Sequence, residues 1–254
     1  MNAALTIARF TLKKALRERL YVVFFIVTAV LIGAGGSVSF FETGVQVKFL
    51  KDVSMFILAA FGFLLALFAA SDLLPHELET RGIQFIVSKP AGWREVVAGK
   101  YLALVALLAG NLAPLIAEMF ALVWLYSGRP HLDMLAGAGL VVVEMAVYGA
   151  LVMLLSVLAS RLVTLFGALL VYVVAHLSDW VTGTFLASSP GWLRACAGAL
   201  LALSPDLSHF DSRFVVVHQY AVPADFLGLL LVYGAVYSVA ALLACCLVLE
   251  SKEL

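Results

Sequence analysis

Long apolar runs alternate with short polar segments over the whole chain. An apolar run of about 20 residues spans a bilayer as a helix, because lipid offers the backbone no hydrogen-bond partner. We therefore predict an all-α polytopic membrane protein in which residues 1–254 form a single transmembrane domain. Six transmembrane helices are expected, at Leu20–Phe41, Val53–Leu74, Val97–Tyr126, Leu135–Ala159, Leu162–Leu186 and Phe226–Leu249.

The composition agrees with this class of protein. The chain is 64% apolar and 13% charged, whereas soluble domains are about 45–50% apolar and about 25% charged. The formal net charge is zero, so the overall charge gives no reason to expect a nucleic-acid partner.

Lysine and arginine residues near the ends of the spans predict the orientation. With six spans, both termini lie on one side, and that side carries eleven of these residues against five on the opposite side. Because cytoplasmic segments carry the excess of positive charge, we predict that both termini are cytoplasmic.

The segment before the first span, residues 1–19, has the pattern of an amphipathic helix. Its apolar stripe is spaced three or four residues apart and its basic residues lie largely elsewhere around the helix, which is typical of a helix in the membrane interface. A simpler alternative is a basic anchor that only fixes the topology. The stripe consists of Leu5, Ala8, Leu12, Ala15 and Leu16.

The most polar loop of the chain, residues 75–96, joins the second and third predicted spans. It opens with charged residues and a glycine and continues with an apolar patch, so it predicts a cytoplasmic amphipathic helix that docks on a partner. An alternative is a loop whose apolar residues rest on the bilayer. The residues concerned are Glu77, Glu79, Arg81, Gly82, Ile83, Phe85 and Ile86.

The longest loop on the opposite side, residues 187–225, is expected to contain short helices. Trp192–Leu203 is apolar but has about 12 residues, too few to cross about 30 Å of hydrocarbon. An interfacial or re-entrant helix is the better interpretation.

The sequence contains no ATP-binding loop. Such a loop needs Gly-x-x-x-x-Gly-Lys-Ser/Thr, and the segment from Gly92 to Lys100 has the wrong spacing and is followed by Tyr101. The histidines are scattered and suggest no metal site, and no catalytic residues are indicated. Any energy from ATP must therefore come from another chain.

Two acidic residues fall inside predicted spans. An ionisable group within the membrane is costly and is a functional hypothesis by default. Glu118 and Glu144 are candidates for a proton relay or a polar substrate path, and they could face one another across a helix pair. The alternative is that each one stabilises packing or a subunit interface.

Four segments, taken together and in order, resemble the permease subunits of the ABC-2 type exporter family. They are TIARFTLKKALRERLYVVFF (6–25), ELETRGIQFIVSKPAGWREVVAGKY (77–101), PDLSHFD (205–211) and the short charged C-terminus. The resemblance covers nearly the whole chain.

This resemblance implies a multi-pass permease of the bacterial inner membrane. The N-terminal helix would lie along the membrane, and the loop with Glu77, Glu79, Arg81 and the patch after Gly82 would be the coupling helix that seats in an ATPase subunit. Two such ATPases, which bind ATP and Mg, and a second permease copy, most simply in a homodimer, would complete the transporter. A periplasmic partner could bind the outer loop.

On this interpretation the chain is a non-catalytic subunit that binds no cofactor itself. It couples ATP hydrolysis to export or to force transmission. One alternative is a proton-coupled secondary transporter that uses Glu144 and Glu118. The other is a membrane-embedded enzyme or assembly factor, for which the spans contain few polar groups.

Overall fold

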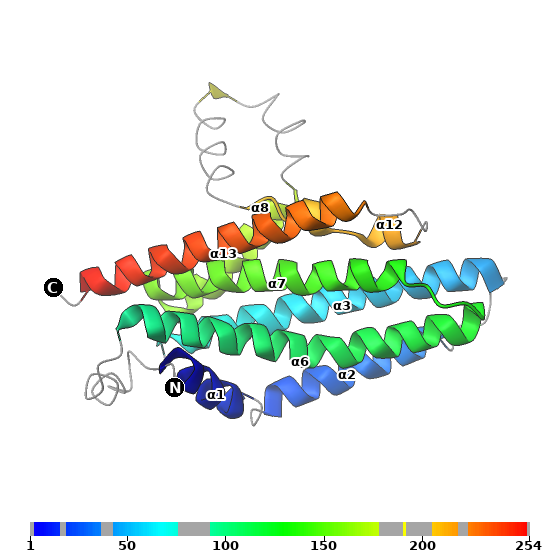
Figure 1. Ribbon diagram of the computed structural model, residues 1–254, viewed down its shortest axis with the longest axis horizontal. Helices are drawn as coiled ribbons and strands as arrows, with labels where there is room; N and C mark the ends of the chain where they lie inside the picture. Colours follow the sequence, from blue (N-terminus) through cyan, green and yellow to red (C-terminus); the bar gives the residue numbers. More distant parts are fainter. Residues whose placement is uncertain are drawn as a thin grey trace.

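The computed structural model describes residues 3–15, 19–36, 43–75, 92–177, 190–191, 205–217 and 223–252, and these residues form an all-α bundle (Figure 1). The long helices are α2 (Arg19–Gly36), α3 (Thr43–Leu73), α6 (Trp93–Ser127), α7 (Asp133–Leu158), α8 (Arg161–His176) and α13 (Ala224–Lys252). The shorter elements are α1 (Ala3–Ala15), the 3-10 turn η2 (Ser208–Phe210) and α12 (Arg213–Val217).

Four of the described helices are long and apolar enough to cross a membrane, at Val45–Leu73, Trp93–Ser127, Met134–Leu158 and Ala224–Ser251. Two further apolar helices, Tyr21–Gly35 and Arg161–His176, are shorter. The protein is therefore a multi-pass helical membrane protein, which confirms the predicted class. Each predicted span coincides with one of these helices, although residues 37–41 and 178–186 of two predicted spans lie outside the described residues.

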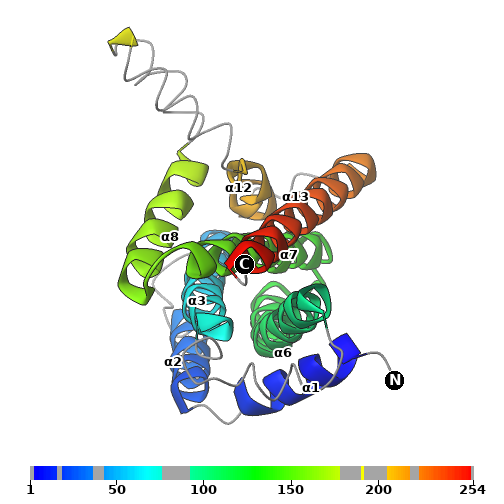
Figure 2. The ribbon, with the colours of Figure 1, turned by 90° about the vertical axis from the view of Figure 1, so that its left-hand side faces the viewer.

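Helices α3, α6 and α7 form the centre of the bundle, and α2, α8 and α13 lie around them (Figure 2). The central position is clearest for α7, where 67% of the span is buried, against 28% for α13. The outer helices expose large apolar side chains such as Val30, Phe166 and Val236. An apolar exterior of this kind is suited to lipid hydrocarbon.

The predicted start of the second span at Val53 is wrong, because α3 begins ten residues earlier, at Thr43. The predicted span left out Lys51, a charged residue, yet its side chain is fully buried. Its Nζ lies 3.2 Å from Nδ1 of His131 and donates to the Val216 carbonyl at 3.4 Å. These partners offset the cost of burying the ammonium group, so the helix continues through this position.

Helix α1 lies across one end of the bundle and packs on α6 (Figure 2). The predicted N-terminal helix is thus confirmed over Ala3–Ala15, whereas its position in a membrane interface stays a prediction. The two helices approach closely at Gly99, where a Cβ atom would lie 2.6 Å from the Ala4 carbonyl oxygen and 3.0 Å from the Ile7 Cβ. Only glycine fits this contact without a shift of the α1 backbone.

Two ion pairs define the same end of the bundle, here called the α1 end. Arg161 Nη2 lies 2.9 Å from Asp72 Oδ2, which joins the start of α8 to the end of α3. Arg94 Nε lies 3.9 Å from Glu250 Oε1, which joins the start of α6 to the end of α13. The end of α3, the start of α6 and the end of α13 therefore lie at the face that α1 covers (Figure 1).

The contact at Gly99 gives a first testable prediction. Gly99→Ala should lower the free energy of unfolding by about 1–3 kcal/mol, the usual cost of overpacking, because the new methyl group meets the Ala4 backbone. The matched control is Gly110→Ala on the same helix, where a Cβ would meet nothing within 4 Å. Unfolding by a denaturing detergent in mixed micelles would measure both. Equal stability of the two variants would contradict the tight α1–α6 contact.

Candidate functional site

The predicted coupling residues lie in a segment that the structure does not describe. Glu77, Glu79, Arg81, Gly82, Ile83, Phe85 and Ile86 all fall within residues 76–91, outside the described residues. Their role therefore stays a prediction.

Glu144 forms the centre of a polar cluster inside the bundle. It lies on the central helix α7, and only 2% of its surface is exposed. Its Oε1 is 3.1 Å from Nε2 of His176, at the end of α8, and Tyr172, one helical turn earlier, donates its hydroxyl to the same oxygen at 3.4 Å. A carboxyl group so deeply buried in an apolar bundle requires such partners.

The hydrogen bonds of His176 indicate how many protons the Glu144–His176 pair holds. Nδ1 lies 3.1 Å from the Tyr172 carbonyl oxygen, which only accepts hydrogen bonds, so Nδ1 carries a hydrogen. The short contact between Nε2 and Glu144 then contains one further proton, located on the carboxyl group or on the ring. The pair is neutral as a whole in both arrangements, so the proton can move between two atoms without a net charge appearing in the bundle.

Aromatic rings from α3, α7 and α8 lie beside the pair. The ring centroids of Tyr172 and His176 are 4.3 Å apart, and Phe63 approaches Tyr172 at the same distance. Tyr148 meets Tyr172 edge-on at 5.1 Å. The Tyr148 hydroxyl is buried without a hydrogen-bond partner within the described part of the chain. The Tyr148 hydroxyl is therefore a donor that no described residue uses, and it lies among apolar side chains.

A pocket of about 400 Å³ opens beside this cluster. Glu144 and His176 lie in its wall, and Asp211 and Arg213 line it from the segment that follows η2. Most of the remaining wall is apolar, as in many small-molecule sites. Its apolar lining includes Phe56, Ala59, Ala60, Phe63, Val141 and Val173.

Asp211 and Arg213 bind each other in this wall through several contacts. The Arg213 guanidinium donates to Asp211 from Nε at 2.9 Å and from Nη2 at 2.7 Å, and the Arg213 backbone N–H donates at 3.1 Å. Burial by itself would raise the pKa of the Asp211 carboxyl, but the hydrogen bonds and charge of Arg213 outweigh burial and lower it. Arg213 also lies over the Phe56 ring, 5.9 Å from its centroid. The pair therefore fixes a charged group at the wall of an apolar pocket.

Glu118 does not belong to this cluster. It lies on α6, and its Oε1 would be 3.5 Å from a Cβ added at Gly33 of α2. The two partners of Glu144 described above, His176 and Tyr172, both come from α8. The described contacts do not bring the two predicted acids together, so they offer no direct relay from one to the other.

The partners of Glu144 were missed at the sequence level, although a signal was present. Helices α7 and α8 form a tight antiparallel hairpin around Ser160. Glu144 lies 16 residues before Ser160 and His176 lies 16 residues after it, so both are at the same depth in the hairpin. Tyr172 and His176 are four residues apart and share one helix face.

Metal chemistry finds no support in the described part of the chain. No group of three or more His, Cys, Asp or Glu side chains that could hold a metal ion occurs among the residues described. What the cluster offers is a proton-holding pair, an aromatic wall and an adjoining pocket.

Comparison with known proteins adds no assignment: no protein-family model matches the chain, and no curated protein matches it.

The Glu144–His176 pair gives a second prediction. His176→Ala should destabilise the protein by about 3–5 kcal/mol, because it removes the closer of the two partners of a buried carboxyl group. Replacement of the pair by apolar residues, Glu144→Leu with His176→Phe, should restore most of this loss. His209→Ala is the control, since that side chain is 53% exposed. Unfolding in mixed micelles measures all three, and a His176→Ala protein as stable as the His209→Ala protein would refute the importance of the pair.

The Asp211–Arg213 pair gives a prediction about pH. Because the pKa of Asp211 is lowered in the folded protein, its contribution to stability is complete above the unfolded pKa of about 3.9 and is lost as pH falls through the folded value. The thermal midpoint of the wild type should therefore exceed that of Asp211→Asn above about pH 5. This difference should shrink in more acidic buffer. Arg213→Gln should abolish it, and a difference that stays constant down to about pH 2 would contradict the pairing.

Proposed function

We propose that this chain is the transmembrane permease subunit of an ATP-driven exporter of the ABC-2 type. It would work in the bacterial inner membrane with both termini in the cytoplasm. Two ATPase subunits would bind ATP and Mg, and a second permease copy, in a homodimer, would complete the path. The chain itself would contribute no catalytic residue.

The arrangement at the α1 end carries this proposal. Helix α3 ends and helix α6 begins at the face across which α1 lies, and residues 76–91 join the two helices in the sequence. A partner pressing on that segment would act directly on two of the three central helices. The positive-inside rule favours the cytoplasm for this face, which is where an ATPase would be.

Ion pairs at the same face extend the mechanical connection. Asp72 and Arg161 join α3 to α8, and Arg94 and Glu250 join α6 to α13. A force on the 76–91 segment would thus reach four of the membrane helices at their ends. We expect the helices to tilt as rigid bodies between two packed arrangements, which is how a small local push becomes a large change.

The output of this movement would be export of a substrate, or force on a periplasmic partner bound at residues 187–225. The second permease copy would pack against an outer helix. Helix α13 is suited to such packing, because its span is only 28% buried, the smallest share among the four long spans.

A second candidate function is proton-coupled secondary transport, favoured by the Glu144–His176 pair. The pair can hold a proton at constant net charge and lies in the wall of a 400 Å³ pocket. Glu118 lies in separate surroundings beside α2. A transporter of this kind would therefore use Glu144 with His176 and not with Glu118.

Charge reversal in the 76–91 segment tests the first candidate. Glu79→Lys and Arg81→Glu should reduce copurification of an ATPase subunit and reduce transport-coupled ATP hydrolysis by at least about tenfold, the effect of unpairing an interface charge. Arg129→Glu is the control, because this exposed arginine lies in the α6–α7 connection at the opposite end of the bundle. Affinity purification from native membranes followed by an ATPase assay provides both measurements.

The outcomes separate the two functions. The exporter proposal fails if the wild-type protein never copurifies with a nucleotide hydrolase. It also fails if a membrane-impermeant thiol reagent outside the cell labels position 79 in the variant Glu79→Cys. Transport by the purified permease alone, driven by a pH gradient and abolished by Glu144→Gln, would establish the secondary transporter instead.

A further inference from the structure

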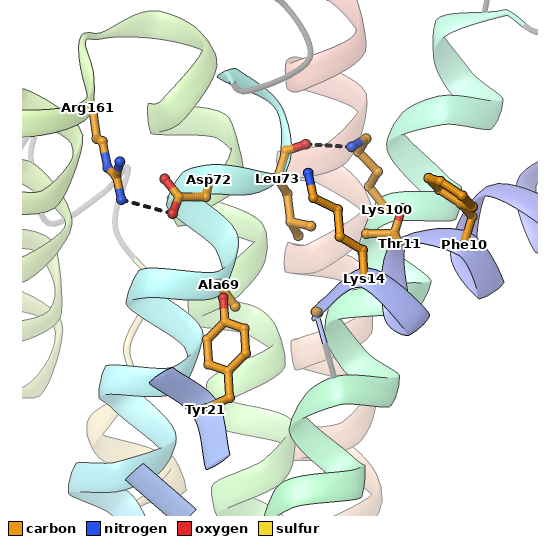
Figure 3. Close-up of a pocket in the computed structure, with 10 residues that line it drawn as sticks. Phe10, Thr11, Lys14, Tyr21, Ala69, Asp72, Leu73, Lys100 and Arg161 are labelled. Carbon is orange, nitrogen blue, oxygen red and sulfur yellow. Dashed lines mark hydrogen bonds and ion pairs between the residues drawn. The ribbon is translucent and has the colours of Figure 1, made fainter. Parts of the chain in front are cut away.

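A second pocket, of about 350 Å³, lies at the α1 end (Figure 3). Five helices meet there: α1, α2, α3, α6 and the start of α8. Their contributions are Phe10, Thr11, Lys14 and Ala15 from α1, Tyr21 from α2, Ala69, Asp72 and Leu73 from α3, Lys100 from α6, and Arg161 from α8. The pocket is separate from the one beside Glu144 and shares no lining residue with it.

The charged groups of this lining are mainly positive. Lys14, Lys100 and Arg161 face a single carboxylate, Asp72, so the lining residues carry a net formal charge of two positive units. Asp72 is held by Arg161 at 2.9 Å through one Nη2 contact. The remaining donors of the Arg161 guanidinium have no acceptor among the residues that the structure describes.

Two ammonium groups converge on the pocket. Lys100 is 3% exposed, and its Nζ donates to the Leu73 carbonyl at 2.6 Å. Lys14 extends from α1 toward Leu73 and Lys100 (Figure 3), and within the described residues its ammonium group forms no hydrogen bond or ion pair. Like charges that approach in a partly apolar space repel each other, so an anion between them would stabilise the arrangement.

The opposite walls of the pocket are apolar. Tyr21, Ala69 and Leu73 line it and also line a smaller pocket of about 20 Å³ that reaches Leu104 and Leu107 between the helices. Phe10 lies at the edge and is 74% exposed. A ligand at this place would therefore meet positive charge at one end and hydrocarbon at the other.

We propose that this pocket binds the headgroup of an anionic phospholipid from the leaflet at the α1 end. Lys14 and Arg161 donate hydrogen bonds to the phosphate oxygens, Lys100 adds positive charge from below, and the glycerol and first methylenes lie against Tyr21 and Leu73. Basic pockets between membrane helices are suited to such headgroups. Free phosphate shares the headgroup chemistry but leaves the apolar wall unused, so the lipid is the better match.

This site is independent of the proposed exporter function. It follows from the pocket and its charges, and a lipid there would contact α1, α3 and α8 together in either of the two candidate transporters.

Binding of short-chain lipids to the purified full-length protein in a neutral detergent tests the proposal. The probes are dioctanoyl phosphatidylglycerol, dioctanoyl phosphatidylcholine and inorganic phosphate, at one fixed ionic strength. Native mass spectrometry gives the bound lipid per chain, and the rise in thermal midpoint gives an independent affinity. We expect phosphatidylglycerol to bind and stabilise the protein, and the other two probes to do so much less.

The variants distinguish the pocket from general charge attraction. Lys14→Gln should weaken phosphatidylglycerol binding about fivefold, the factor expected for one basic residue near an anionic lipid, and Lys14→Arg should retain it. Lys13→Gln is the matched control, because Lys13 is the neighbouring residue on α1 but does not line the pocket. Lys14 is exposed on the helix surface, so its replacement leaves the fold intact.

The proposal would be overturned by an equal loss for Lys13→Gln and Lys14→Gln, by equal binding of the zwitterionic lipid, or by no binding of the anionic lipid. Saturation by inorganic phosphate at the concentration that suffices for phosphatidylglycerol would show a phosphate site and would refute the assignment to lipid.

Discussion

Charged side chains inside an apolar bundle persist only when another element supplies a partner, and this requirement connects the helices of the protein. Lys51 of α3 meets His131 and the Val216 carbonyl at one end of the bundle. Glu144 of α7 meets His176 and Tyr172 of α8 near the middle. Lys100 of α6 meets the Leu73 carbonyl at the α1 end. Each central helix thus carries one buried lysine or glutamate among the described residues, and that side chain is bound by a different element. These contacts fix the register of each helix along its neighbours. Apolar side chains alone specify this register weakly, because one can replace another.

The two pockets lie near different members of this set. The pocket beside Glu144 combines a proton-holding pair, aromatic rings and the Asp211–Arg213 pair, and it suits a small ligand or a proton. The pocket at the α1 end combines three cations with an apolar wall and lies beside the end of α3, where Asp72 and Leu73 line it. In the proposed exporter, a lipid bound there would be adjacent to the helices that receive force from the ATPase. The lipid composition of the membrane and the nucleotide state of the ATPase would then both act on the same helix ends.

Hydropathy was sufficient for the class, for the approximate bounds of the helices and for the N-terminal helix, because lipid restricts a crossing segment to an apolar helix. It failed at the start of α3. The predicted span left out Lys51, because the burial of this lysine depends on His131, which is distant in sequence.

The cost of an acid in a membrane was enough to single out Glu144. To predict its partner, His176, the register of the α7–α8 hairpin was also needed. Glu118 was paired with Glu144 on plausibility alone, and the rotation of α6, which directs it toward Gly33, has no simple sequence signal. The pocket with Lys14, Lys100 and Arg161 could not be predicted, since it joins residues from five helices.

The close contact between Gly99 and Ala4 has a consequence for the order of assembly. Ala4 is made 95 residues before Gly99, so α1 leaves the ribosome long before its docking surface exists. Helices α2 and α3 are made between them, and α6 follows. Until α6 exists, α1 lacks its main packing partner in this chain, and its basic residues and exposed Leu5 and Phe10 would suit the surface of a bilayer. Helix α1 is therefore made well before the helix it packs against, and the α1–α6 contact can form only after α6 has been made.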